Sequence, residues 1–139
     1  MKLSVKSDYA MRAVLALARQ YHTRAAQTVE QVATEQAVPP NYLVQILIEL
    51  KAKQIVRSMR GKQGGYLLAR APAEITMGDV LRCVHGDVFD SPALHDPNCA
   101  AELRGAWERL RKSVSAEADA ITFQQLLDEA TEKQKMYYI

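Results

Sequence analysis

Apolar and polar positions alternate with helical spacing through the first part of the chain. Ser7 or Asp8 can cap a first helix that runs to about Tyr21. Its apolar positions recur at i, i+3, i+4 and i+7, and they are Met11, Val14, Leu15 and Ala18. The pattern therefore predicts an amphipathic helix that buries one face.

Two shorter helices follow, joined by a tight turn. Thr28 and Gln31 have the spacing of a capping box, which opens a helix that ends near Gln36. Pro40 suits the first turn of a third helix, because its missing N–H costs nothing there. This third helix is expected to end near Lys53. The predicted inward-facing positions are Val29, Val32, Ala33, Tyr42, Leu43, Ile46, Leu47 and Leu50.

A glycine-rich basic stretch separates two short apolar runs. Residues 57–66 lie between Ile55-Val56 and Leu67-Leu68-Ala69. Apolar runs around a glycine-rich centre are typical of a β-hairpin with an open tip. The glycines of this predicted wing are Gly61, Gly64 and Gly65. From Lys51 to Arg70 the chain has six Lys or Arg and no Asp or Glu, so the hairpin is positively charged.

The second half begins with another capped helix. Thr76 and Asp79 have the capping-box spacing, and the helix should run through about His85. Residues 86–98 contain Pro92 and Pro97 and show no periodicity, which predicts a loop.

The longest predicted helix runs from about Ala100 to Ala118. It carries one apolar stripe, formed by Leu103, Ala106, Trp107, Leu110 and Val114. Such a stripe can pack on its own domain, but outside a small compact domain it favours a partner helix. A last short helix, capped at Thr122, is expected to end near Thr131.

Two short helices joined by a turn and followed by a basic hairpin predict a winged helix-turn-helix domain. The expected fold class is mainly α with a small β-hairpin wing and a long C-terminal dimerisation helix. The expected organisation is a DNA-binding domain at 1–85, a loop at 86–99, dimerisation helices at 100–131 and a tail at 132–139.

Composition and charge add two expectations. The 139 residues are 48% hydrophobic, and no apolar run reaches the length of about 18 residues that spans a bilayer. With no signal-peptide core at the N-terminus, we expect a soluble cytoplasmic protein without membrane contact.

Residues 1–72 carry 11 Lys and Arg against 4 Asp and Glu, whereas residues 73–139 carry 7 Lys and Arg against 12 Asp and Glu. This asymmetry favours nucleic-acid contact by the first half.

The predicted DNA contacts follow from winged-helix geometry. The helix from Pro40 should enter the major groove by its N-terminal end, where the Gln45 amide can read adenine. Arg60, at the hairpin tip, can enter a narrow minor groove. The complete set is Asn41, Tyr42, Val44, Gln45, Lys51, Lys53, Arg57, Arg60 and Lys62. Any one of these charges could equally be a solvated surface charge, but the set together favours DNA.

The sequence does not favour an enzyme. The three histidines, His22, His85 and His95, accompany no recognisable nucleophile motif. Gly61–Gly65 is not a phosphate-binding loop, because no Lys-Ser or Lys-Thr follows.

Several motifs resemble one known family. They are Asn41-Tyr42-Leu43, Ile55-Val56-Arg57-Ser58-Met59-Arg60-Gly61, Gly64-Gly65-Tyr66-Leu67-Leu68-Ala69, Pro72 and Ile75-Thr76-Met77-Gly78-Asp79-Val80, with the opening Met1-Lys2-Leu3-Ser4 and Tyr9-Ala10. Over essentially the whole chain, they resemble the Rrf2 family of bacterial transcription regulators. The resemblance implies a homodimeric repressor that binds a palindromic operator in double-stranded DNA, with Tyr42 and Arg60 at DNA-contact positions. Family members that hold an iron–sulfur cluster often carry Glu where this chain has Val44, which implies a different base preference.

The same resemblance raises the question of an iron–sulfur cluster. Many relatives bind one through three cysteines near residues 86–99, whereas this chain has only Cys83 and Cys99. A cluster here would need the set Asp8, Cys83, Cys99 and either His95 or His85, with Asp8 as the oxygen ligand implied by the resemblance. Such clusters are held mostly by thiolates, so we expect no cofactor and a core position for Cys83. Zinc bound by His95, Asp96 and Cys99 is a still weaker match.

The chain ends in Met136-Tyr137-Tyr138-Ile139, an apolar and aromatic end that could simply pack back on the dimer. The cysteine-metabolism repressors of the family also lack the cluster cysteines and end in an aromatic-Ile tail. Similar termini bind O-acetylserine sulfhydrylase through the terminal carboxylate. The resemblance therefore implies Ile139 as an anchor, with Tyr137 and Tyr138 lining the entry groove.

Three functional hypotheses remain open. The first is a DNA-binding repressor, with control of cysteine or sulfur metabolism through the tail. The second is an iron–sulfur or thiol-based redox sensor of the same fold that uses Asp8, Cys83, His95 and Cys99. The third is a protein-interaction module that acts on the sulfhydrylase, with DNA contact secondary.

Overall fold

The computed structural model describes residues 2–62 and 64–137. The α-helices are α1 (Val5–Arg19), α2 (Val29–Gln36), α3 (Pro40–Ala52), α4 (Met77–Val84), α5 (Ala101–Ala120) and α6 (Phe123–Tyr137). One antiparallel hairpin joins β1 (Val56–Met59) to β2 (Gly65–Leu68), and two short 3-10 helices lie at Pro72–Glu74 and Pro92–His95. The predicted fold class, mainly α with a β-hairpin wing, is confirmed in these elements.

Helix α1 forms the centre of the core. Its side chains Ala10, Ala13, Val14 and Leu17 are buried against α2, α3, α4 and the hairpin. The helix begins earlier than expected, because Ser4 is the cap and accepts a hydrogen bond from the Ser7 N–H at 3.3 Å. The prediction that Ser7 or Asp8 caps the helix is therefore wrong, since both lie in its first turn.

Helices α2 and α3 form the expected helix-turn-helix. Thr28 and Gln31 make both hydrogen bonds of the capping box, as predicted. Ala37 closes the turn in the left-handed region, with φ of 54°. Helix α3 buries the stripe Leu43, Ile46, Leu47 and Leu50. The expected burial of Tyr42 is wrong, because its side chain is 53% exposed.

Three residues join α3 to the hairpin, and one of them has unusual backbone geometry. Gln54 has φ of 61°, a left-handed conformation that is uncommon outside glycine. The strands pair from Val56 opposite Leu68 to Met59 opposite Gly65. Gln27, in the α1–α2 connection, pairs with Tyr66, so the hairpin is also tied to the start of the helix-turn-helix.

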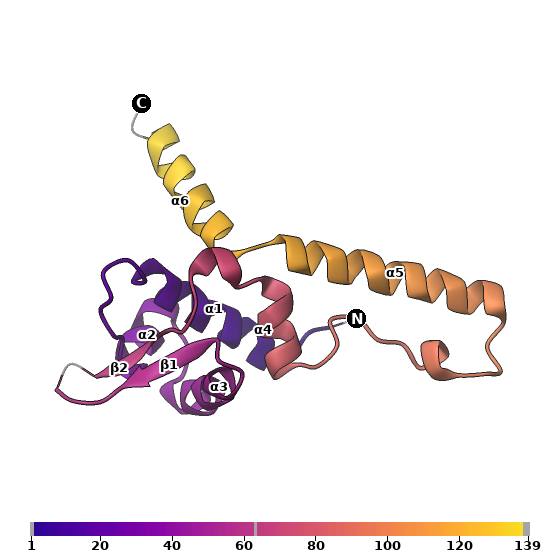
Figure 1. The fold of residues 1–139 in the computed structure, drawn as a ribbon, viewed down its shortest axis with the longest axis horizontal. Coiled ribbons are helices and arrows are strands. Elements are labelled where there is room, and N and C mark those ends of the chain that lie inside the picture. Colours follow the sequence, from indigo (N-terminus) through magenta and orange to yellow (C-terminus); the bar gives the residue numbers. More distant parts are fainter. Residues whose placement is uncertain (1, 63, 138–139) are drawn as a thin grey trace.

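Helix α4 begins at the predicted capping box of Thr76 and Asp79 and ends at Val84. The segment between α4 and α5 is irregular, as expected, except for the 3-10 turn at Pro92–His95. Figure 1 shows this segment running beneath α5, away from the core.

Helices α5 and α6 project from the compact domain in different directions (Figure 1). Within α5 only Ala118 is buried. Thr122 accepts a hydrogen bond from the Gln125 N–H at 3.1 Å and so caps α6, as predicted. The prediction that this helix ends near Thr131 is wrong, because it continues through Tyr137. The tail residues Tyr138 and Ile139 lie outside the described residues.

Candidate nucleic-acid interface

One face of α3 is buried and the opposite face is open to solvent. The open face carries Asn41, Val44, Gln45 and Ile48. The first three are the predicted groove-facing residues, and the helix places them together. Sequence reasoning missed Ile48, although its position one turn after Val44 puts it on the same face.

Tyr42 lies beside this face, at the first turn of α3. Its ring packs edge to face against Tyr9 of α1, with 5.7 Å between centroids. The Arg12 guanidinium lies 6.0 Å from the Tyr9 centroid and donates to the Gln36 carbonyl at 3.1 Å. These contacts hold the start of α3 in place from the α1 side while leaving Tyr42 exposed.

The hairpin presents its charge at two places. Arg60 and Lys62 are exposed at the tip, which lies at the end of the molecule opposite the far end of α5 (Figure 1). Arg57 instead lies at the base of the hairpin, where it borders a cavity of about 350 Å³ together with Tyr21, His22 and Arg24. Met59, exposed on β1, is an apolar wing residue that sequence reasoning did not single out.

The glycines of the hairpin have distinct structural reasons. Gly61 has φ of 111° and turns the chain at the tip. At Gly64 and Gly65 the backbone is crowded, and a Cβ on Gly65 would overlap the carbonyl oxygen of Gln27. Glycine at position 65 therefore permits the close approach that ties the hairpin to the α1–α2 connection.

The cations of this surface differ from three cations elsewhere in the domain, which pair with carboxylates. Lys6 pairs with Glu49 at 2.7 Å, Arg12 with Asp8 at 3.0 Å and Arg19 with Glu35 at 3.0 Å. Within residues 2–62 and 64–137, no carboxylate lies within 4.0 Å of the cationic groups of Lys51, Lys53, Arg57, Arg60 or Lys62. Such unpaired cations are available to neutralise phosphates.

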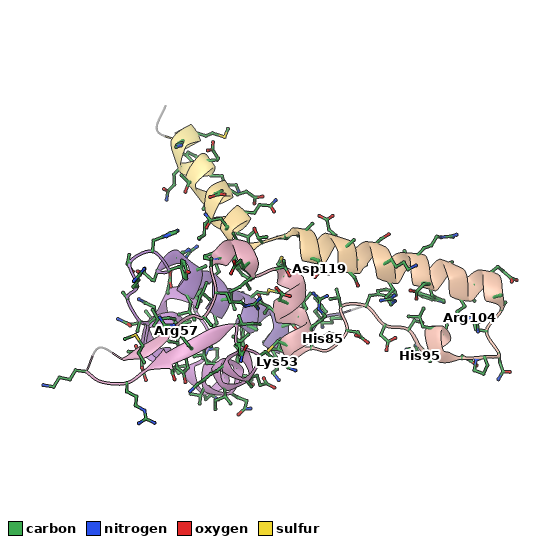
Figure 2. The ribbon with its side chains drawn as sticks, viewed as in Figure 1. Lys53, Arg57, His85, His95, Arg104 and Asp119 are labelled. Atoms are coloured by element: carbon green, nitrogen blue, oxygen red, sulfur yellow. The ribbon has the colours of Figure 1, made fainter. Side chains whose placement is uncertain are left out.

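The candidate metal ligands do not converge within one chain. Asp8 pairs with Arg12, and the His95 ring nitrogen lies 3.1 Å from Asp90. Cys99 donates weakly to the Ala100 carbonyl, with 3.6 Å between sulfur and oxygen. Among the described residues there is no group of three or more His, Cys, Asp or Glu side chains that could hold a metal ion. Figure 2 shows His95 on the outlying segment, far from the compact domain. The residues present in one protomer therefore do not fit an iron–sulfur cluster.

Cys83 occupies a different environment, between α4 and α3. Its thiol donates to the Glu49 carbonyl, with 3.4 Å between sulfur and oxygen. Burial raises the pKa of the Cys83 thiol, and the Glu49 carboxylate raises it further, while Lys53 and Lys6 act in the opposite direction. The side chain is only partly buried, so the expected core position is only partly correct.

Comparison with known proteins identifies the family. The sequence profile of Rrf2, described as an iron-dependent transcriptional regulator, matches residues 3–129. The chain belongs to the Rrf2 family. The resemblance seen in the hairpin and helix motifs is thereby confirmed, and the chain is a transcriptional regulator rather than an enzyme.

Individual relatives refine this placement. The HTH-type transcriptional regulator CymR of Bacillus subtilis is 30% identical over 99% of this chain and 97% of its own length. The solved structure of B. subtilis CymR, titled the global cysteine regulator, superposes with a TM-score of 0.83 at 28% identity, covering 93% of this chain and 98% of CymR. The structure of T. potens IscR gives a TM-score of 0.82 at 31% identity, covering 99% of this chain and 97% of IscR. The likeness to CymR supports a place in the CymR-like branch of the family.

A further relative matches over a shorter stretch. The Mycobacterium tuberculosis protein Rv1287, which bears the name of an HTH-type transcriptional regulator, is 46% identical over 62% of this chain. The match covers 53% of Rv1287, so about half of that protein has a counterpart here. Rv1287 and CymR both bear the names of HTH-type transcriptional regulators. In the part of the chain that the structure describes, no helix is long and apolar enough to cross a bilayer.

Proposed function

We propose that the chain is a homodimeric repressor that binds a palindromic operator. Helix α3 of each protomer enters the major groove by its N-terminal end, and the hairpin tip enters the adjacent minor groove. The observation that carries this proposal is the open face of α3, which leads directly into a hairpin whose cations have no carboxylate partner among the described residues.

The proposed contacts divide by role. Asn41, Val44 and Gln45 face the base edges, and the Gln45 amide reads adenine through paired hydrogen bonds. Arg60 reads groove width and favours A·T sequence. Contacts to phosphate position the protein without reading sequence, and they come from Tyr42, Lys51, Lys53, Arg57 and Lys62.

The proposed dimer interface is the apolar stripe of α5. Leu103 and Leu110 are 53% and 51% exposed, which is unusual for leucines on one helix face. Trp107 and Val114 lie on the same stripe, and Trp107 packs beside Phe89 with 6.0 Å between ring centroids. A second copy would cover this stripe by a two-fold contact. In this proposal residues 1–85 bind DNA, residues 86–99 form a connecting loop, residues 100–131 dimerise and residues 132–139 are the C-terminal tail.

Salt dependence tests the DNA contact. Affinity for operator DNA, measured by fluorescence anisotropy, should fall steeply with salt because several phosphates are neutralised together. Arg60→Ala should reduce both the affinity and the preference for A·T sequence beside each half-site. Arg109→Ala is the matched control, because Arg109 is an exposed cation on α5, outside the proposed DNA contacts. A flat salt response, or equal effects of the two substitutions, would rule out this docking.

We further propose control of cysteine or sulfur metabolism through the C-terminal end. The near full-length similarity to CymR supports this regulatory role. Tyr137 is 89% exposed at the end of a helix that projects from the domain, so a partner can reach it. In the proposed complex the Ile139 carboxylate enters the active site of O-acetylserine sulfhydrylase, with Tyr137 and Tyr138 at its entrance.

Deletion of residues 136–139 tests this second proposal. The truncated protein should lose capture of purified O-acetylserine sulfhydrylase and keep its affinity for operator DNA. Unchanged capture would eliminate the role of the tail. If the deletion removes capture and wild type shows no sequence-specific DNA binding, the chain acts as an interaction module. Visible absorbance of protein purified without oxygen, together with iron analysis, tests the iron–sulfur alternative that the family description and the likeness to IscR raise.

A further inference from the structure

A small pocket lies on the compact domain where α3, the hairpin and α4 meet. Its volume is about 230 Å³, and its lining residues are Lys53, Ile55, Arg70, Asp79, Arg82 and Cys83. Lys53 and Ile55 stand on either side of the left-handed Gln54, and Arg70 follows β2. We call this site the basic pocket. None of the proposed base-reading residues lines it.

The charges around the basic pocket are only partly compensated. Arg82 pairs with Asp119 of α5 and, at 3.6 Å, with Asp79. These carboxylates raise the pKa of Arg82, mainly through the hydrogen bond to Asp119, so it stays charged. Asp79 also accepts the Thr76 N–H of its capping box at 3.0 Å. The two carboxylates are therefore occupied by Arg82 and the helix cap.

Arg70 and Lys53 remain for a ligand, and Lys53 is also one of the proposed phosphate contacts. Arg70 donates to the Glu74 carbonyl at 3.4 Å, and within the described ranges no carboxylate lies within 4.0 Å of Arg70 or Lys53. The Cys83 thiol borders the same space and Ile55 is almost fully buried beside it. A concave site with two such cations suits a small anion that a guanidinium can hold by two parallel hydrogen bonds.

We propose that the basic pocket binds a small oxyanion, a carboxylate, sulfate or phosphate group, between Lys53 and Arg70. A volume of about 230 Å³ is too small for a large cofactor and limits the ligand to a compact metabolite or a free inorganic ion.

The position of the basic pocket suggests what binding does. An anion held there contacts Lys53 at the end of α3 and Arg70 next to the hairpin, across the Gln54 joint. Arg82 links the same pocket to α5 through Asp119. Figure 2 labels Lys53, which directly follows α3, and Asp119, which lies on α5. Occupancy therefore bridges α3 and the hairpin and stabilises the arrangement in which the backbone hydrogen bonds hold them. This coupling rests on the proposed DNA-binding function, whereas anion binding itself does not.

Alkylation of Cys83 tests anion binding without DNA. In Cys99→Ser protein, Cys83 is the only cysteine, and its rates with anionic iodoacetate and neutral iodoacetamide are measured by mass spectrometry. The ratio of the two rates cancels the thiolate fraction, so it reports local charge. It should be about threefold higher in native protein than in urea. Inorganic phosphate at constant ionic strength should slow both reagents in native protein.

Charge variants complete the test. Arg70→Gln should lower the rate ratio toward its value in urea, as should Lys53→Gln, whereas Arg109→Gln should leave it unchanged. Circular dichroism confirms that each variant is folded. A native ratio no higher than in urea, or phosphate that gives no protection, overturns the proposal. Sulfate and malonate replace phosphate in parallel assays, which separates tetrahedral from carboxylate ligands. If wild-type protein does not bind operator DNA, the proposed function is refuted, but the result on anion binding in the basic pocket still stands.

Discussion

The ring of Tyr9 in α1 meets the ring of Tyr42 in α3 edge to face, with 5.7 Å between centroids and 70° between ring planes. This contact fixes the Tyr42 ring while its side chain stays 53% exposed. Tyr42 therefore combines a packing role, through the ring, with a proposed phosphate contact, through the hydroxyl.

Substitution at Tyr42 separates these two roles. Tyr42→Phe keeps the ring contact and removes the hydroxyl, so operator affinity should fall about tenfold, the effect of one hydrogen bond to a charged group. The melting temperature should stay within about 1 °C, because an exposed hydroxyl contributes little to stability. Anisotropy titrations and thermal melts measure the two quantities. Full affinity in Tyr42→Phe would remove the hydroxyl from the proposed contacts.

The close approach of Gly65 to Gln27 makes a prediction about the hairpin. Gly65→Ala places a methyl group against the Gln27 carbonyl and should destabilise the fold by about 1–3 kcal/mol. Gly105→Ala is the matched control. It lies in the interior of α5 with open space around it, so the fold should gain up to about 1 kcal/mol. Urea denaturation followed by circular dichroism gives both free energies. Equal effects would mean that the Gln27 contact is unimportant.

The exposed stripe of α5 makes a prediction about assembly. Leu110→Glu places a charge on the stripe in both protomers, and an interface built there should weaken at least about 100-fold. Arg109→Glu changes the charge on the neighbouring face and should leave assembly intact. Light scattering after size-exclusion chromatography measures the mass of each variant. A dimer that survives Leu110→Glu at micromolar concentration would place the interface elsewhere.

The environment of Cys83 predicts a pH dependence. Burial raises the pKa of the native thiol above that of the unfolded chain. The resulting stabilisation is complete below the unfolded pKa and is lost as pH rises through the native pKa. In Cys99→Ser protein, the midpoint of the pH profile for iodoacetamide alkylation should lie higher in native protein than in urea. A native midpoint at or below the urea value would show that the positive charge of Lys53 dominates.

The sequence predicted a helix start correctly where the capping residues lie within one helical turn of each other. Thr28 with Gln31 and Thr76 with Asp79 were both found as capping boxes, because each is complete within four residues. The cap of α1 could not be chosen in this way. Ser4 and Ser7 are equally good caps by residue type, and only the burial of Ser7 in the folded domain decides between them.

The end of α6 was missed for a different reason. Residues 132–135 are polar, which favours the predicted tail, but no glycine or proline that would end a helix follows Thr131. The basic pocket could not be predicted from the sequence either. Its residues Lys53, Arg70 and Arg82 lie in separate parts of the chain that only the tertiary fold brings together. The same limit applies to the candidate metal ligands, because their spacing along the sequence does not give their distances in the folded chain.

The attachment of the hairpin has a consequence for which operators the protein can accept. Ile55 donates to the Leu50 carbonyl at 3.0 Å, Ala69 donates to Ile55 at 2.9 Å, and Tyr66 donates to Gln27 at 2.8 Å. These bonds join the base of the hairpin to α3 and to the α1–α2 connection, so its reach cannot adapt freely. We therefore expect one extra base pair, inserted between the sequence read by α3 and the A·T tract, to abolish one of the two contacts.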